Sequence, residues 1–337
     1  MKKYLVLSND KIFLKNKKVS SDFNDVINII ESIGKKYEIF LLSRNSKKKL
    51  PFSGKILNKI TRINYNSISL LKKYKQIRIF VISITWRNFI NFLIIKFFKG
   101  KISGYVYLRS DGSKEYQKKI GYIGIVFYKF MLNYFKNNLK IISVSNQIYN
   151  TEKKLIVKPS ELDRDWFSNQ KKISTDKPKV LYLGRIKVEK GVYSLLKLFS
   201  DIKKDYKLSI VGGSHNFKKT SKISFFKQVS KKKELIKLYN NHNIFILPSY
   251  TEGAPKVILE SLSRLRPVIV FNEIKHVKSN LRGIFICDRR SYDLKKKINY
   301  ILLNYKKIQK EMKKNNLTTK KSFQKKLLKI LDASYTK

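Results

Sequence analysis

Two cationic side chains, Arg185 and Lys190, follow a short apolar run and lie between glycines. The run Val180–Leu183 is typical of a strand, and the apolar spacing after Gly191 predicts a helix. Open α/β sheets bind ligands at the carboxyl ends of their strands. Two cations at such an edge suit a diphosphate, although ordinary surface cations in a lysine-rich chain would look the same.

A second segment has the same organisation of strand, loop and helix. The strand Ile244–Leu247 runs into the loop Pro248–Ala254, and a helix is expected to open at Pro255, since proline suits the first helical position. Backbone N–H groups near Gly253 and Ala254 would then be unpaired at the helix start. Together with the helix dipole they predict an anion site.

Two carboxylates accompany this predicted anion site. Glu252 lies at its rim, and Glu260 follows after seven intervening residues, which is about two helical turns or roughly 12 Å of rise. A carboxylate accepts two hydroxyl protons at once and therefore suits a sugar or ribose diol. Two surface glutamates are the alternative, but Glu260 lies among apolar residues and the chain has only 23 acidic residues.

The formal charge is strongly positive. Seventy-five Lys and Arg against 23 Asp and Glu give +52 at pH 7. Such a balance is compatible with solvated surface charge, but it also favours attraction to an anionic membrane surface. A nucleic-acid-binding protein is a further alternative, although the sequence contains no motif of that class.

Cysteine and histidine are too few for a metal centre. Cys287 is the only cysteine, so no internal disulfide can form, and it makes no cluster with the three histidines. The apolar run near the start is too short for a signal peptide, and no apolar stretch is long enough for a membrane-spanning helix. We therefore expect a cytoplasmic protein without bound metal.

Short apolar runs that alternate with amphipathic stretches position these residues. This alternation predicts parallel strands joined by right-handed crossovers, hence doubly wound sheets. In the first half the expected strands are Tyr4–Ser8, Tyr37–Ser43, Arg78–Thr85, Ser103–Leu108 and Lys140–Ser145, with helices near Asp25–Ile33 and Phe89–Phe98.

The alternation restarts after a polar, aperiodic stretch, Asp165–Lys179, which we interpret as a linker. We expect an α/β chain of two domains, residues 1–168 and 169–337, with a helical tail from about Asp293. The further elements expected are Val180–Leu183, Val192–Phe199, Leu208–Gly212, Ile244–Leu247, a helix from Pro255, and Val268–Phe271.

The paired segments resemble the signature of retaining glycosyltransferases of family 4, over about Lys179–Asn272. These enzymes have the GT-B fold, in which two Rossmann-like domains face a cleft. The residues that carry the resemblance are Gly184-Arg185, Glu189-Lys190-Gly191, Ile210-Val211-Gly212-Gly213, Leu247-Pro248-Ser249, Glu252, Glu260 and Pro267-Val268-Ile269.

The resemblance implies a role for each matched residue. Arg185 and Lys190 would bind the donor diphosphate, Glu252 the hydroxyls of the transferred sugar, and Glu260 the ribose. The remaining donor-binding residues would be Gly184, Gly253, Ala254 and Pro255. Enzymes similar to this act without a bound metal or another cofactor, because positive side chains stabilise the leaving diphosphate.

The chain departs from the family pattern at three places. Residues Asn9–Ser20 contain no glycine, where relatives have a glycine-rich loop. Relatives often carry a histidine near the donor sugar in the first domain, but all three histidines here (His215, His242, His276) lie in the second. Asp111 could replace that histidine as a catalytic residue, or cap the following helix. Arg266 stands where relatives usually have the glycine that ends a helix.

The acceptor in this fold approaches from the first domain. Two aromatic and basic stretches there, Trp86–Lys99 and Lys119–Lys136, are typical of helices that lie in a membrane interface, or of ordinary core-facing helices. We expect transfer of a sugar to a glycan or lipid-linked acceptor in cell-surface polysaccharide or lipopolysaccharide-type biosynthesis, at the inner face of the membrane. A nucleotide-sugar epimerase, a hydrolase of activated sugars and an inactive transferase are the alternatives.

Overall fold

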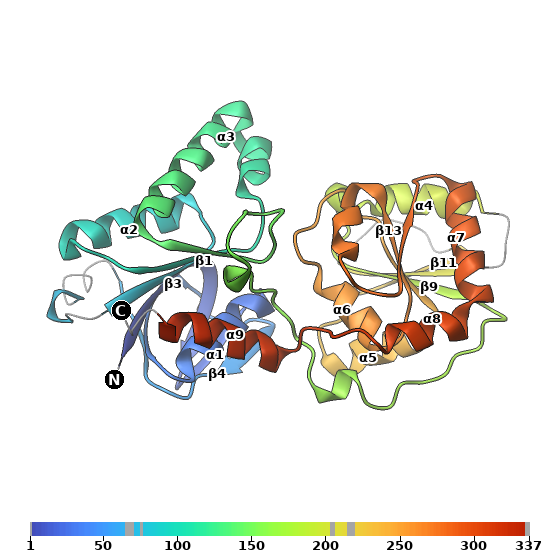
Figure 1. The fold of residues 1–337 in the computed structure, drawn as a ribbon, viewed down its shortest axis with the longest axis horizontal. Coiled ribbons are helices and arrows are strands. Elements are labelled where there is room, and N and C mark those ends of the chain that lie inside the picture. Colours follow the sequence, from blue (N-terminus) through green and yellow to red (C-terminus); the bar gives the residue numbers. More distant parts are fainter. Residues whose placement is uncertain (1, 65–70, 75–76, 203–205, 214–219, 334–337) are drawn as a thin grey trace. The chain divides into compact units, whose positions relative to one another are not determined.

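The computed structural model describes the chain except residues 1, 65–70, 75–76, 203–205, 214–219 and 334–337 (Figure 1). It forms two compact units. The first contains Met1–Pro159 together with Lys320–Lys337, and the second contains Ser160–Thr319. The chain therefore passes from one unit to the other twice.

The first unit is built on a sheet in which five strands run parallel beside β1. The parallel order is β5-β3-β1-β6-β7-β8, and the far part of β1 continues antiparallel into β2 and β4. Its strands are β1 (Lys3–Lys15), β2 (Lys18–Ser21), β3 (Glu38–Asn45), β4 (Phe52–Lys55), β5 (Ile60–Arg62), β6 (Ile77–Ile82), β7 (Gly104–Leu108) and β8 (Lys140–Ser143).

A β-hairpin occupies the stretch where the family resemblance led us to look for a glycine-rich loop. Strand β1 shifts register between Ser8 and Lys11 and then pairs with β2. The two turn residues, Asn16 and Lys17, have φ of 46° and 61°. Positive φ at both central residues is what a tight hairpin turn requires, and asparagine tolerates it better than most residues.

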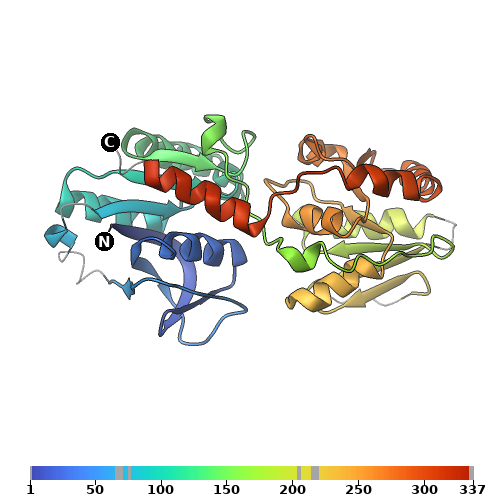
Figure 2. The same ribbon diagram turned by 60° about the horizontal axis from the view of Figure 1, so that its bottom comes forward.

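Four helices cover the faces of this sheet. Helices α1 (Asn24–Gly34) and α9 (Lys320–Ala333) lie on one face, and α2 (Trp86–Lys99) and α3 (Gly112–Asn138) on the other (Figures 1 and 2). A short 3-10 turn, η2 (Lys153–Leu155), follows β8. Hydroxyls of Tyr4 and Tyr105 donate to main-chain oxygens of α9 at 3.3 and 2.9 Å, so α9 is an integral part of the first unit.

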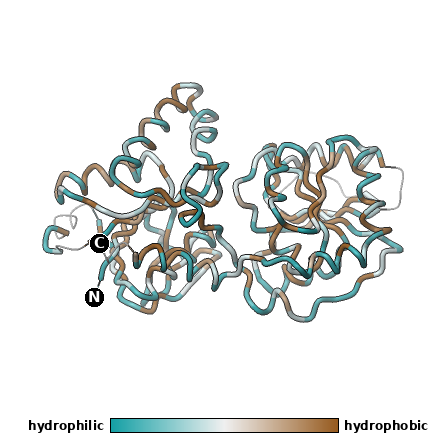
Figure 3. Tube along the Cα trace, in the orientation of Figure 1, coloured by the Kyte–Doolittle hydropathy of each residue, from teal (hydrophilic) through white to brown (hydrophobic). Residues whose placement is uncertain are grey.

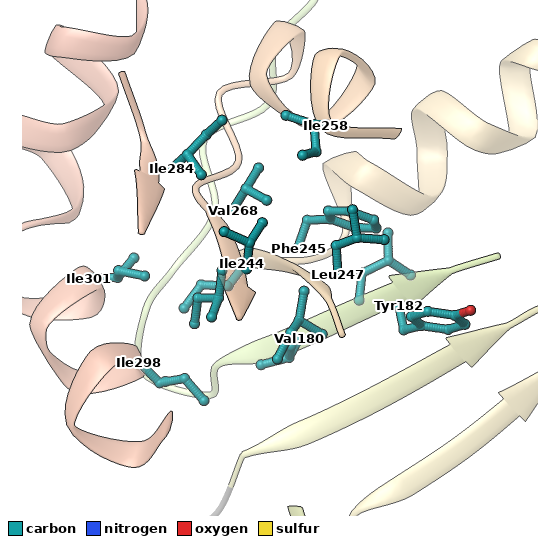
Figure 4. Close-up of a cluster of buried hydrophobic side chains, with 14 of the residues drawn as sticks. Val180, Tyr182, Ile244, Phe245, Leu247, Ile258, Val268, Ile284, Ile298 and Ile301 are labelled. Carbon is teal, nitrogen blue, oxygen red and sulfur yellow. The ribbon is translucent and has the colours of Figure 1, made fainter. Parts of the chain in front are cut away.

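The second unit contains a fully parallel six-stranded sheet with the order β11-β10-β9-β12-β13-β14. Its strands are β9 (Lys179–Leu183), β10 (Lys207–Val211), β11 (Ile223–Phe226), β12 (Ile244–Leu247), β13 (Val268–Phe271) and β14 (Ile284–Cys287). Because helices cover both faces, the central strands are apolar throughout rather than alternating. Figure 4 shows Val180, Phe245 and Val268 of these strands packed among isoleucines of the flanking helices.

The helices of the second unit flank its sheet on both sides (Figure 1). Helices α5 and α6 lie on one face, and α4 and α7 on the other. The bounds are α4 (Val192–Ser200), α5 (Lys232–Asn240), α6 (Lys256–Ser263), α7 (Ser291–Leu303) and α8 (Tyr305–Met312), with the 3-10 turns η3 (Arg164–Trp166), η4 (Val188–Lys190) and η5 (Asn272–Lys278).

The fold class expected from the sequence is confirmed, and each strand named there is present within a few residues. The strands that the apolar pattern missed are short or lie at sheet edges, as β4, β5 and β11 do. The expected domain limits need two corrections. Residues 160–168 belong to the second unit, and α9 belongs to the first.

The stretch Asp165–Lys179 is wrongly predicted as a linker between domains. It packs within the second unit, where Trp166 is buried. Its main-chain oxygens accept hydrogen bonds from two buried arginines. Arg264 donates to Trp166, Ser168 and Asn169 at 2.7–2.9 Å, and Arg266 donates to Lys171 at 2.8 Å.

Helix α6 ends without a glycine, and Arg266 is not the residue that takes the left-handed conformation. The left-handed residue is Leu265, with φ of 55°, one position earlier. The Arg266 amide then donates to the Ser261 carbonyl at 3.0 Å. Arg266 has a structural role, because its buried guanidinium donates hydrogen bonds to the Tyr239 carbonyl in α5 and to the Lys171 carbonyl before β9.

Within the described ranges no helix is long and apolar enough to cross a bilayer. In the same residues no group of three or more His, Cys, Asp or Glu side chains has an arrangement that could hold a metal ion.

Arg264→Ala should destabilise the protein by about 3 kcal/mol or more, because buried carbonyls of residues 166–169 and the Asn240 side chain would lose their charged donor. Urea denaturation followed by circular dichroism measures this loss. The control is Arg290→Ala, since the ion pairs of Arg290 in the described residues are solvent-exposed, and it should leave the stability close to that of the wild type. Equal stability of the two variants would contradict the role given to Arg264.

Candidate donor-binding site

The candidate site lies where the strand order of the second sheet reverses. Strands β9 and β12 are neighbours, while the chain continues from β9 to β10 on one side and from β12 to β13 on the other. Two loops therefore leave the sheet side by side, 184–191 after β9 and 248–255 after β12. This reversal point is the usual ligand site of open α/β sheets.

The loop after β9 is fixed by its main chain. The Gly184 amide donates to the Val211 carbonyl at 3.0 Å, and the Tyr182 hydroxyl donates to the Arg185 carbonyl at 2.8 Å. Gly191 has φ of 67°, and a Cβ atom there would lie 1.9 Å from the Pro248 oxygen. Only glycine permits this approach, so Gly191 allows the two loops to pack against each other.

A salt bridge joins the two loops. Lys190 Nζ donates to Glu252 Oε1 at 2.6 Å, and the Ser249 hydroxyl donates to the same oxygen at 2.7 Å. The Tyr250 amide also donates to the Glu189 carbonyl at 3.0 Å. Both charged side chains are largely shielded from solvent, with 20% and 12% exposure. The structure thus brings together Lys190 and Glu252, which the sequence placed 62 residues apart.

Arg185 remains available for a ligand. Its side chain is exposed, and in the part of the chain that the structure describes it makes no hydrogen bond or ion pair. A guanidinium binds phosphate oxygens through two parallel N–H donors. Arg185 and Lys190 therefore offer a fixed and a free cation at one sheet edge.

The helix start beside Glu252 has the expected donors with one change of geometry. Helix α6 begins at Lys256, and Pro255 is its extended N-cap residue rather than its first helical residue. Main-chain N–H groups of Gly253 and Ala254 have no acceptor among the described residues. They lie at the positive end of the α6 dipole, which favours an oxygen-rich or anionic group.

Arg289 and His276 bind the main chain of the 248–255 loop, a role that the sequence did not predict for either residue. Arg289 donates to the Pro248 carbonyl at 2.9 Å, pairs with Glu273 at 2.7 Å, and stacks over the Tyr250 ring at 4.3 Å. The ring of His276 hydrogen-bonds the Glu252 carbonyl through Nε2 at 2.9 Å. No sequence signal distinguishes Arg289 from its many basic neighbours, because only the fold brings it to this loop.

Residues 163–318 match the family model of the glycosyl transferases group 1. This range is nearly the whole second unit and contains both loops of the site. The second unit thus matches this family along nearly its whole length, and we call the matched residues the group 1 domain.

Known proteins are similar to part of the sequence and to the whole fold. An N,N'-diacetylbacillosaminyl-diphospho-undecaprenol alpha-1,3-N-acetylgalactosaminyltransferase of Campylobacter jejuni is 25% identical over 147 residues, which are 41% of this chain and 39% of that protein. The matched part thus spans about two fifths of that relative.

Solved structures resemble the chain over nearly its full length. Sucrose-phosphate synthase of Thermosynechococcus elongatus is 13% identical, with a TM-score of 0.68 and 100% of both chains covered. WaaG, a glycosyltransferase involved in lipopolysaccharide biosynthesis, is 12% identical, with a TM-score of 0.63 over 97% of this chain and 99% of its own. The fold of this chain is therefore GT-B.

Glu260 lies in the interior of the group 1 domain. Its side chain is on α6 and only 8% of the residue is exposed. The Tyr239 hydroxyl donates to Glu260 Oε2 at 3.0 Å. Burial raises the pKa of Glu260 to about 7, although the Tyr239 hydrogen bond acts in the opposite direction. An apolar setting of this kind strengthens any hydrogen bond to a ligand hydroxyl, and the ribose contact of Glu260 stays a prediction.

The first unit gives Asp111 the capping role. Asp111 Oδ1 accepts hydrogen bonds from the Ser113 amide at 3.0 Å and the Ser113 hydroxyl at 2.5 Å, at the start of α3. A catalytic contact of Asp111 stays a prediction. Its neighbour Arg109, which follows β7, instead contacts Asp10 in β1 at 3.2 Å and Ser83 after β6 at 2.8 Å.

The three histidines have different places. His276 holds the site loop as described. His242 is buried behind the sheet, where its ring nitrogens bond Leu238 and Ser209 at 2.7 and 2.8 Å. Its pKa is lowered by burial. His215 lies outside the described residues.

Glu260→Gln should change the pH dependence of stability in the group 1 domain. Between pH 4.5 and 7 the folded protein keeps a proton on Glu260 that the unfolded chain has lost, so the free energy of unfolding falls as pH rises through this window. Glutamine removes this fall. Relative to the wild type, the free energy of unfolding of the variant should therefore rise by about 3 kcal/mol between pH 4.5 and pH 8.

Urea denaturation at both pH values measures the difference. Glu234→Gln is the matched control, since Glu234 is exposed on α5 and should follow the wild type at both pH values. If Glu260→Gln also follows the wild type, the Glu260 carboxyl is not held neutral by burial.

Proposed function

We propose that this protein is a glycosyltransferase that transfers a sugar from a nucleotide-sugar donor, with retention at the anomeric carbon. The observation that carries the proposal is the ion pair of Lys190 and Glu252, at the strand-order reversal of a group 1 domain. A diphosphate needs a cation, and a sugar rich in hydroxyl groups needs a hydrogen-bond acceptor beside it. Lys190 provides the cation and Glu252 provides the acceptor.

The charges of the site fit the charge that develops during transfer. As the bond between sugar and diphosphate breaks, negative charge grows on the leaving phosphate and positive charge on the sugar. Lys190 has three N–H donors, and the pair with Glu252 uses one. Lys190 and Arg185 can therefore bind phosphate oxygens while Glu252 binds the sugar hydroxyls, which stabilises the transition state more than the ground state.

We propose that no metal takes part in donor binding. A metal in such enzymes would neutralise the diphosphate, and here Arg185, Lys190 and the main-chain donors of Gly253 and Ala254 are placed to do so. Gly184 gives the diphosphate access to the main chain, and Glu260 would hold the ribose.

We further propose a glycan or lipid-linked acceptor, used at the inner face of the membrane in polysaccharide or lipopolysaccharide-type biosynthesis. Two similarities support this: the relative from Campylobacter jejuni is named for a diphospho-undecaprenol acceptor, and WaaG is involved in lipopolysaccharide biosynthesis. The charge of +52 also favours adsorption to an anionic membrane.

Lys190→Ala should slow turnover roughly tenfold or more, because it removes a charge-assisted hydrogen bond worth about 1.5–3 kcal/mol. It also leaves Glu252 unpaired beside the diphosphate. Glu252→Gln should lower turnover as well, whereas Glu260→Gln should chiefly raise the donor KM. Steady-state kinetics with nucleotide-sugar donors measures these effects, and release of free sugar without acceptor reports hydrolysis separately.

Lys187→Ala is the matched control for Lys190→Ala, because Lys187 is exposed and belongs to the same loop. It should keep wild-type turnover. Wild-type turnover in both Lys190→Ala and Glu252→Gln would place the active site elsewhere.

Donor binding should persist without divalent ions. Titration calorimetry with UDP, GDP, ADP and dTDP in the presence of a chelator tests this. At least one nucleotide should bind equally well with chelator and with Mg²⁺, and Arg185→Ala should weaken it. Loss of binding for every nucleotide in the chelator would rule out the metal-free site.

A further inference from the structure

Helix α3 is a bent hairpin rather than one straight helix. The bend is at Ile120 and Gly121, where Gly121 has φ of 68° and ψ of −152°, a conformation that only glycine adopts readily. Beyond the bend the chain packs back on the first half. A Cβ atom on Gly124 would lie 2.3 Å from the Tyr116 carbonyl oxygen, and the Tyr116 and Phe127 rings are 6.1 Å apart. The tip of the hairpin is therefore held by its own packing.

The tip and outer side of this hairpin expose large apolar side chains. We call them the α3 stripe: Ile120, Tyr122, Ile123, Val126 and Phe130, exposed by 53, 79, 76, 67 and 58%. Helical spacing places the last four on one side of α3. The other side is buried through Tyr128, Met131 and Phe135. Figure 3 shows hydrophobic colouring along the part of α3 that projects from the unit.

The structure separates α3 from the other stretch that the sequence singled out, Trp86–Lys99. That stretch is α2, whose Phe89, Phe92 and Ile95 are buried. Phe89 packs against Phe130 and Tyr134 of α3 with ring centroids 5.8 and 5.4 Å apart. Helix α2 is thus a core helix that supports α3, and the apolar surface belongs mainly to α3.

The charge around the α3 stripe selects its partner. Residues 39–151 contain 22 Lys and Arg and only two acidic residues, Asp111 and Glu115. Exposed Lys119 and Lys129 flank the stripe. A second copy of this chain would bring like charges together, and phosphates of nucleic acid would leave the apolar side chains unused. An anionic lipid surface suits both the positive charge and the apolar side chains, since lysines reach the lipid phosphates while apolar side chains enter the acyl boundary.

We propose that the α3 stripe inserts into the interfacial region of an anionic bilayer and docks the first unit on the membrane. Lys119 and Lys129 then lie at the level of the lipid phosphates. This inference deepens the membrane association described under Proposed function and rests on it. It specifies a peripheral contact made by side chains of one hairpin, with both helix ends on the same side of the bilayer.

The test uses the full chain and sedimentation with vesicles of phosphatidylcholine, alone or with about a third phosphatidylglycerol. Wild type should sediment with the anionic vesicles, and less so at high salt. The double variant Ile123→Ser with Val126→Ser should partition at least roughly tenfold more weakly, because two exposed side chains lose their apolar contact with lipid. Since both residues are exposed, its circular dichroism and melting should match the wild type.

Phe97→Ser is the matched control. Phe97 is 85% exposed on α2 but lies at the end next to Lys96, which contacts Asn138 at the base of α3 rather than its tip. It should bind vesicles as the wild type does. Environment-sensitive dyes on Val126→Cys and Phe97→Cys add a second readout, since the native Cys287 is buried. Only the dye at position 126 should shift to the blue on addition of anionic vesicles.

Wild-type vesicle binding by the double variant, or equal dye shifts at positions 126 and 97, would overturn the proposal. So would a wild-type dimer in sedimentation velocity that the double variant abolishes, because the stripe would then be a contact between copies. Nucleotide calorimetry is the independent check on the proposed function. The double variant should bind nucleotide as the wild type does, so loss of docking and loss of donor binding are separate results.

Discussion

The salt bridge between Lys190 and Glu252 is the contact on which the candidate site depends. It forms only because parallel pairing places β9 beside β12, so that loops distant in sequence leave the sheet together. The close approach of Gly191 to Pro248 sets the spacing of those loops. A larger residue at Gly191 would strain the turn and move the two loops apart. The charges of Lys190 and Glu252 would then separate, although neither side chain is changed.

Support for this pair comes from strands further along the sheet. Arg289, after β14, and His276, after β13, bond main-chain oxygens of the loop that carries Glu252. Both hydrogen bonds use main-chain oxygens of the loop, so neither of them occupies the Glu252 carboxylate. Preorganisation of this kind lowers the reorganisation that a ligand must induce. The mostly apolar sheet below provides the rigid platform for it.

Much of the fold and the positions of the two loops of the candidate site could be predicted from the sequence. The strands before Arg185 and Pro248 are apolar runs, and Gly184 and Pro248 mark where these runs end, so the sequence locates the two loops. The supports at Arg289 and His276 were not predictable, because they depend on contacts between sequence-distant loops. The burial of Arg264 and Arg266 was also not predictable, because the sequence does not distinguish an arginine that donates to buried carbonyls from one in solvent.

The return of α9 to the first unit has a consequence for the order of folding during synthesis. The second unit is one continuous segment, whereas the first needs Lys320–Ala333 to cover the face of α1. Ribosomes add about 5–20 residues per second, so that face waits on the order of ten seconds for its partner helix. Throughout that interval the side of α1 that later contacts α9 faces water or a chaperone. The unit made first is therefore the unit completed last.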